Sequence, residues 1–130
     1  MTDLYLTESH FEAEIPILTE EQRGRKTPPY NYIRWDFGYA EDNPLEPVRN
    51  LDTEIYMIWP NLLDDDGTPI EKGIPLNGTY NARMHILVKE MLDHHRKRVS
   101  VGLKFNCHEG ARVVARGEVT RLRAISSDGK

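Results

Sequence analysis

Apolar and polar residues alternate over several short segments of this chain, which is the period of a half-buried β-strand. In residues 11–18, alternate apolar side chains from Phe11 to Ile17 would share one face, with Glu12 and Glu14 on the other. Pro16 has no backbone donor, so this strand is expected at a sheet edge or interrupted there. The same reasoning predicts further strands over four segments: 30–39, 53–59 (ended by Pro60), 99–105 and 113–122.

The segment 80–98 fits two periods. Met84, Leu87 and Met91 have helical spacing, whereas Met84, Ile86 and Val88 alternate as in a strand. Taken alone, the pattern slightly favours a helix. Strand-rich patterns elsewhere indicate an all-β domain, for which a sandwich and a closed antiparallel barrel are equally compatible with composition.

Polar and turn-forming residues predict loops over 19–26, 40–50 and 61–78. The last of these is longer than a compact domain usually needs, so it is a candidate functional loop. Its acidic run, Asp64 to Asp66, is interpreted as a solvated turn. A calcium loop needs acidic ligands at alternate positions and a closing bidentate Glu, which this run lacks.

Length and composition fit one soluble domain. The chain has 130 residues, of which 38% are hydrophobic and 29% charged. Its single cysteine, Cys107, excludes an internal disulfide. The N-terminal residues do not form a secretion signal and no apolar run is long enough to span a membrane, so we expect a cytoplasmic protein without a membrane partner.

The net charge of −4 is unevenly distributed along the chain. Residues 1–93 hold 8 Lys/Arg and 18 Asp/Glu (net −10), whereas residues 94–123 hold 8 Lys/Arg and 2 Asp/Glu (net +6). This asymmetry permits one basic face on an acidic body, or charges that balance in space. The densest basic run is His94–Arg98, which could track phosphates or be a solvated loop.

Three blocks carry a resemblance to a known domain. They are Phe11–Ile15 with Gly24–Pro28; Ile33–Phe37, in which Arg34 and Phe37 match; and Gly102–Phe105 with the Glu109–Arg112 turn and Gly117. Their order and spacing resemble the third domain of elongation factor Tu.

The resemblance implies a six-stranded antiparallel closed barrel over 11–123, with a lead-in over 1–10 and a tail over 124–130. It also places a strand over 80–90, and we predict irregular structure or a short turn over 91–98. The companion GTPase domain would be missing. The chain has no G-x-x-x-x-G-K loop, so it is not expected to bind GTP by itself.

In that family, the domain contacts the T stem of aminoacyl-tRNA, packs on the GTPase domain and meets the exchange factor. The matching turn carries His108, Glu109 and Gly110 to the tRNA-contacting surface. His108 stands where the family usually has arginine, and Asp36 where it has glutamine; both departures oppose phosphate binding. The residues expected to bind a protein or RNA partner are Arg25, Lys26, Arg34, Asp36, Arg96, Lys97, Arg98, Lys104, His108, Glu109, Gly110 and Arg112.

We therefore predict a non-enzymatic binding module without a cofactor, recognising a translation-related protein or tRNA. One alternative is an immunity or decoy protein that mimics elongation factor Tu, and another is direct RNA binding through His95–Arg98, Lys104 and the Glu109–Gly110 turn. A hydrolase using Cys107 lacks an orienting third group in the sequence. A metal site at Cys107 and His108 is disfavoured because adjacent strand residues point to opposite faces. The histidines are expected to be solvated at the surface, and Cys107 to be buried.

Overall fold

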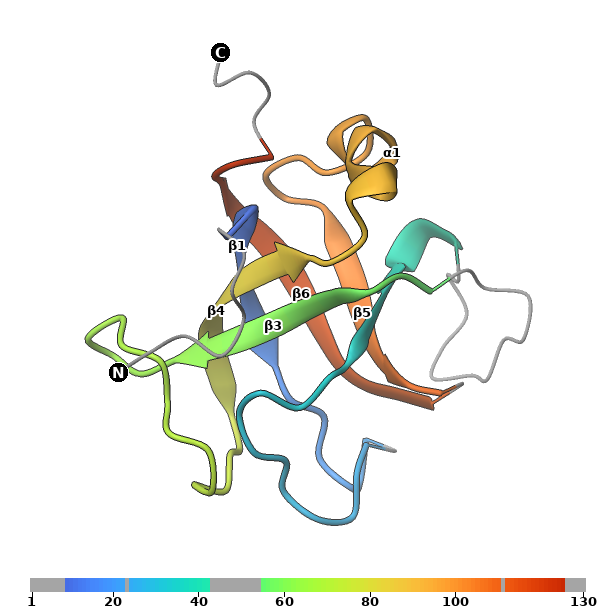
Figure 1. The fold of residues 1–130 in the computed structure, drawn as a ribbon. Coiled ribbons are helices and arrows are strands. Elements are labelled where there is room, and N and C mark those ends of the chain that lie inside the picture. Colours follow the sequence, from blue (N-terminus) through green and yellow to red (C-terminus); the bar gives the residue numbers. More distant parts are fainter. Residues whose placement is uncertain (1–8, 23, 43–54, 111, 126–130) are drawn as a thin grey trace.

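The protein is built around one six-stranded antiparallel sheet (Figure 1). This computed structural model describes residues 9–22, 24–42, 55–110 and 112–125. The strands are β1 (Phe11–Pro16), β2 (Asp36–Tyr39), β3 (Ile58–Leu63), β4 (Thr79–Ile86), β5 (Lys104–Glu109) and β6 (Arg112–Leu122). Two connections contain short helices. η1 (Ala40–Asp42) follows β2, and η2 (Lys89–Met91) and α1 (Leu92–Arg96) lie between β4 and β5. The strand order is β2-β5-β6-β1-β4-β3, so the prediction of an all-β, antiparallel fold is confirmed.

The first and last strands of the domain, β1 and β6, are neighbours in the sheet. β1 lies between β6 and β4, with Glu14 opposite Glu118 and Ile15 opposite Tyr80. Phe11, Ala13 and Ile15 are fully buried, as the alternation predicts. An edge position for β1 is wrong, because both of its sides are paired. The strand instead ends at Pro16, which has no amide proton to continue the ladder.

The sheet curls into a half-barrel in which the edge strand β2 is bridged to Tyr56, two residues before the other edge strand, β3. The amide of Phe37 donates to the carbonyl of Tyr56 (2.9 Å), and the amide of Tyr56 donates back to Phe37 (2.8 Å). We call the meeting line of β2 and β3 the seam.

The outward amides of β3 are protected although β3 is an edge strand. The amide of Ile58 donates to the carbonyl of Tyr56 (2.9 Å), and that of Leu62 to Oδ1 of Asn31 (2.8 Å). Between them stands Pro60, which has no amide proton. This arrangement leaves no run of edge donors for another chain to pair with. The prediction that the strand ends at Pro60 is therefore wrong. This proline lies inside β3, on the unpaired side of an edge strand, where its missing amide proton removes no hydrogen bond of the sheet.

Two other predicted strands are displaced. Of residues 30–39, 36–39 form strand; Asn31 begins a turn because its side chain is bonded to β3, as described below. Of residues 99–105, 104 and 105 form strand, and β5 continues to Glu109. Val101 lies in a turn and is 63% exposed, so its place in the alternating pattern does not reflect burial. Residues 53 and 54 of the predicted 53–59 strand lie outside the described residues.

The ambiguous segment 80–98 begins as a strand, as predicted. β4 covers Thr79–Ile86, and η2 and α1 follow, so the expectation of irregular structure over 91–98 is corrected to a short helix. The predicted loop 61–78 is confirmed from Asp64 onward, whereas 61–63 belong to β3. The lead-in (except 9–10), the tail after 125 and most of the 40–50 loop lie outside the described residues.

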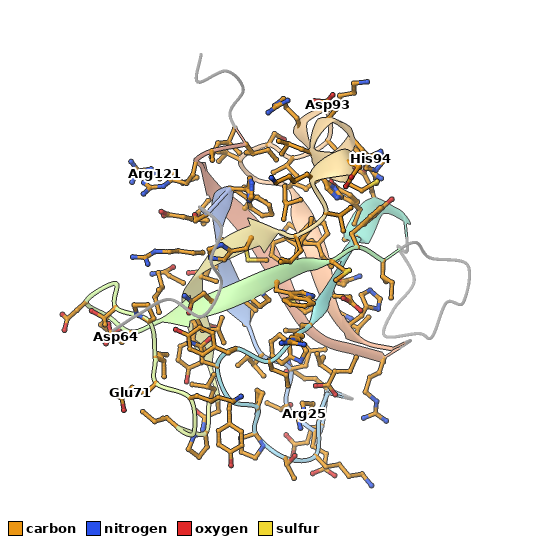
Figure 2. All side chains as sticks on the ribbon, viewed as in Figure 1. Arg25, Asp64, Glu71, Asp93, His94 and Arg121 are labelled. Atoms are coloured by element: carbon orange, nitrogen blue, oxygen red, sulfur yellow. The ribbon has the colours of Figure 1, made fainter. Side chains whose placement is uncertain are left out.

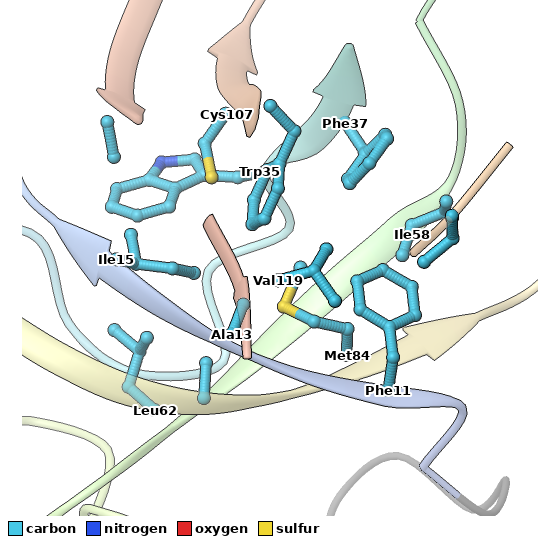
Figure 3. Packing of buried hydrophobic residues seen from close by; sticks show 14 of the residues in the cluster. Phe11, Ala13, Ile15, Trp35, Phe37, Ile58, Leu62, Met84, Cys107 and Val119 are labelled. Atoms are coloured by element: carbon cyan, nitrogen blue, oxygen red, sulfur yellow. The ribbon is translucent and has the colours of Figure 1, made fainter. Parts of the chain in front are cut away.

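The core lies inside the curl, where side chains from all six strands meet (Figure 3). The Phe37 and Phe105 rings stack with centroids 4.6 Å apart. Phe105 lies opposite Gly117 in the β5–β6 register, where a Cβ would overlap its ring. The glycine therefore makes room for an aromatic side chain that closes the core.

The two ends of the curl are filled by side chains that are not in the strands. Trp35 is fully buried near the β5–β6 turn, where its Nε1 donates to Glu109. Figure 1 shows α1 at the opposite end, and this helix contributes His95, which is 1% exposed. Within the described residues, no helix has the length and apolar character needed to cross a bilayer.

Candidate partner-binding surface

The twelve residues expected to contact a partner fall into two groups, near the two ends of β5. Figure 2 labels Arg25 of one group and, in α1 at the other end, Asp93 and His94. Arg96, Lys97, Arg98 and Lys104 lie at the α1 end. The other eight lie near the β5–β6 turn, a strand length of about 17 Å away. The group at the turn is Arg25, Lys26, Arg34, Asp36, His108, Glu109, Gly110 and Arg112.

Glu109, at the β5–β6 turn, contacts both Trp35 and Arg25. Its Oε2 accepts a hydrogen bond from Trp35 Nε1 (2.8 Å) and lies 3.4 Å from Arg25 Nε. Arg112 donates to the carbonyl of Gly24 (3.1 Å). Gly110 has φ 62°, a left-handed conformation that suits glycine and makes the tight turn possible. These contacts tie the 24–27 loop to the turn, so the sequence blocks that suggested the resemblance meet in space.

His108 does not lie where the sequence placed it. Its side chain is 3% exposed, so the expectation of a solvated contact residue is wrong. Burial lowers its pKa, and this effect exceeds the opposing influence of Asp36 and of the Gly110 backbone. A neutral, buried imidazole does not present a cation to a phosphate.

An exposed apolar stripe leads into β3 beside the seam. Ile55 and Met57 are 41% and 45% exposed, and the partly exposed Trp59 continues the same side of the strand. The guanidinium carbon of Arg34 lies 5.0 Å from the centre of the Trp59 ring. Trp59 Nε1 is 3.4 Å from Oδ1 of Asp36, its cross-seam neighbour. We call these five residues the seam surface.

The sequence contained part of the signal for this surface. Ile55, Met57 and Trp59 are recognisable as one face of a strand. The pattern does not show which face is covered, because the opposite face, with Tyr56 and Ile58, is also apolar. Ile58 is 1% exposed, so its side of the segment faces the core and the side with Ile55 and Met57 faces solvent.

The basic residues at the α1 end are largely paired with carboxylates. Arg96 Nη1 lies 2.7 Å from Oδ1 of Asp93, and Lys104 Nζ lies 3.6 Å from Oε1 of Glu118. Arg98 Nη2 lies 2.6 Å from Oε2 of Glu41, and its guanidinium carbon is 3.7 Å from the centre of the Tyr39 ring. Lys97 is exposed. Of the two alternatives for the uneven charge, the contacts at the α1 end favour charges that balance in space.

His95 is a structural residue, which corrects the expectation of a solvated surface histidine. Its Nδ1 lies 2.7 Å from the hydroxyl of Tyr39, inside an aromatic cluster with Tyr56 and His94. Burial is the main cause of the lowering of its pKa to about 4, and the neighbouring His94, Arg98 and His10 lower it further. The fold therefore holds this imidazole neutral.

We expect stability to fall as the pH is lowered from 6.5 to 4. In this window the unfolded state binds a proton at His95 and the folded state does not. The contribution of His95 to the free energy of unfolding is therefore fully present above pH 6.5, and about 3 kcal/mol of it is lost as the pH falls to 4. Urea titrations from pH 4 to 7.5 measure this slope. In His95→Gln the slope should shrink, leaving the smaller part of the same sign that comes from His108. An unchanged slope would contradict the assignment.

Cys107 is buried at 2% exposure, as expected, and burial raises its pKa well above the usual range. The thiolate that a nucleophile needs is therefore disfavoured. Among the described residues, no group of three or more His, Cys, Asp or Glu is arranged to hold a metal ion.

A scan against protein-family models and a search of curated proteins find no match to this sequence. The function is therefore inferred from the geometry of the surface.

Proposed function

We propose that this protein is a non-enzymatic binding module that recognises another protein through the seam surface. The observation that carries this proposal is the exposed group of Trp59, Met57 and Ile55 with Arg34 stacked on the tryptophan. Tryptophan, methionine and arginine are enriched in protein interfaces, and tryptophan and arginine dominate their binding energy.

Charge favours a protein partner over tRNA. Three of the four basic residues at the α1 end have carboxylates within 4 Å, and at the turn end Arg25 is paired with Glu109. Since counterion release scales with cations available to phosphates, such pairing weakens an RNA site. Recognition of tRNA through Lys26, Arg112 and the turn is the second candidate, favoured by the exposure of Lys26 and Arg112.

We further propose that the curled sheet is a barrel of the kind found in the third domain of elongation factor Tu, closed at the seam. Support comes from the Phe37–Tyr56 bridge and from the contact between the 24–27 loop and the β5–β6 turn. By this likeness, the partner is a protein of the translation machinery that grips that domain. The exchange factor and the GTPase domain are the first two to test.

We expect Arg34→Glu and Trp59→Ala each to weaken the partner complex at least about tenfold, or roughly 1.4 kcal/mol. The probes are purified exchange factor, the isolated GTPase domain of elongation factor Tu, and bulk aminoacyl-tRNA, each titrated by calorimetry. One of the two proteins should bind with little response to salt. Lys97→Glu is the matched charge reversal at the far end of the sheet and should leave this affinity unchanged.

Two results would contradict these proposals, the first for a protein partner and the second for the likeness to elongation factor Tu. If aminoacyl-tRNA alone binds, with a steep loss of affinity on adding salt, the second candidate is correct. If none of the three probes binds at about 100 μM, a concentration that detects complexes near −5 kcal/mol, the likeness does not identify the partner.

A further inference from the structure

A concave site lies away from the seam surface, in the long connection between β3 and β4. Its cavity has a volume of about 490 Å³, which is within the usual range for ligand sites. Pro69, Ile74, Pro75 and Tyr80 contribute apolar walls. Ile74 is 48% exposed, so a large apolar side chain is presented to solvent at this site.

The walls of this cavity are held by specific hydrogen bonds. The carbonyl of Ile70 accepts from Asn31 Nδ2 (2.7 Å), and the amide of Leu76 donates to the carbonyl of Pro29 (2.9 Å). The hydroxyl of Tyr80 accepts from the amide of Asn77 (3.0 Å). The loop is therefore fixed at both sides of the cavity, and binding would not require it to be ordered first.

The cavity has acidic lining residues and adjoins a second hollow; we call the two together the acidic groove. Asp64 and Glu71 line the cavity itself. A neighbouring hollow shares Asp64 and Tyr80 with it and adds Glu14 and Asp65. Residues 64–80 contain four acidic residues and one Lys, a net charge of −3. An apolar pocket with several carboxylates beside it is complementary to an apolar side chain with cations beside it.

We propose that this groove binds an extended basic segment of another protein, with an apolar side chain in the cavity and Lys or Arg residues along the carboxylates. Two adjoining hollows that share residues can take successive side chains of a peptide, one apolar and the others cationic. The site shares no residue with the seam surface, so it stands whether or not the proposed function is correct.

The test uses the full chain labelled with ¹⁵N and an acetylated, amidated peptide of sequence Leu-Trp-Lys-Lys-Lys. Amide signals of residues 64–81 should shift in a saturable way, with a Kd below about 1 mM. Ile74→Ser and Glu71→Lys should each raise the Kd at least about fivefold. The matched controls are Val101→Ser, another exposed apolar residue, and Glu90→Lys, another exposed acid; both should leave the Kd unchanged.

Three further probes decide what the groove recognises. Leu-Trp-Glu-Glu-Glu should not bind, and equal binding by it would overturn the role of the carboxylates. Ala-Ala-Lys-Lys-Lys should bind at least fivefold more weakly, and equal binding would overturn the role of the cavity. Tryptamine binding as tightly as the basic peptide would indicate a small-molecule site instead. An absence of shifts with the basic peptide at millimolar concentration would also overturn the proposal.

Discussion

Gly117→Val is expected to destabilise the protein by about 4 kcal/mol, close to the whole stability of a small domain. The Cβ alone would overlap the Phe105 ring, with 2.7 Å to its Cε1 atom. The ring cannot move away freely, because it is fully buried and stacked on Phe37. The midpoint and slope of urea unfolding measure this loss, and Gly117→Ala should fall between the wild type and the valine variant.

Two controls separate overpacking from a general cost of removing glycine. Gly67 has a positive φ of 80°, and a Cβ added there would meet open space. Gly67→Ala should therefore lower the free energy of unfolding by only about 1 kcal/mol, the usual backbone penalty. Combining Gly117→Val with Phe105→Leu should destabilise less than the sum of the two single changes, because the smaller side chain relieves the overlap. Additive losses would show that the ring is not the cause.

Asn31→Leu is expected to cost about 4 kcal/mol, because its side chain is fully buried and completes hydrogen bonds for three backbone groups. Its Oδ1 accepts from the amide of Leu62 (2.8 Å). Its Nδ2 lies 2.7 Å from the carbonyl of Ile70, 3.1 Å from that of Leu62 and 3.0 Å from Oδ1 of Asn61. Leucine has a similar volume, so the loss reports these polar contacts and not a cavity.

The same change should loosen the loop that forms the acidic groove. The carbonyl of Ile70 would lose its bond to Asn31, while the amide of Ile70 would still donate to Leu62, so trypsin should cleave after Lys72 faster in Asn31→Leu than in the wild type. Asn81→Leu, an exposed asparagine of β4, is the matched control for both measurements. Equal stability of the two variants would show that the buried hydrogen bonds of Asn31 contribute nothing.

Local pattern predicts an element well where one face of a strand is buried. In β1, Phe11 to Ile15 alternate without exception, so the strand and its buried face both follow from the sequence. In residues 99–105 the same period occurs, but Val101 is exposed in a turn. A period of two is necessary for a half-buried strand and is not sufficient, because an apolar residue in a turn costs little when exposed.

Several site features depend on residues far apart in the chain. Arg25 and Glu109 were both expected at the binding surface, yet their pairing depends on the loop after β1 reaching the β5–β6 turn. The burial of His95 and His108 could not be predicted, since no local signal distinguishes a buried imidazole from a solvated one. The seam surface likewise depends on which side of the apolar segment 55–59 faces the core.

The sequence by itself determined the all-β class, the strand at residues 11–15 with its buried face, and the tight turn at Gly110. These follow from alternation, from the placement of proline and glycine, and from short connections, all of which act over a few residues. Tertiary structure alone decided the seam between β2 and β3, the neutral histidines and the acidic groove. Each of these depends on desolvation and on contacts across tens of residues, which arise only when the curled sheet closes around its core.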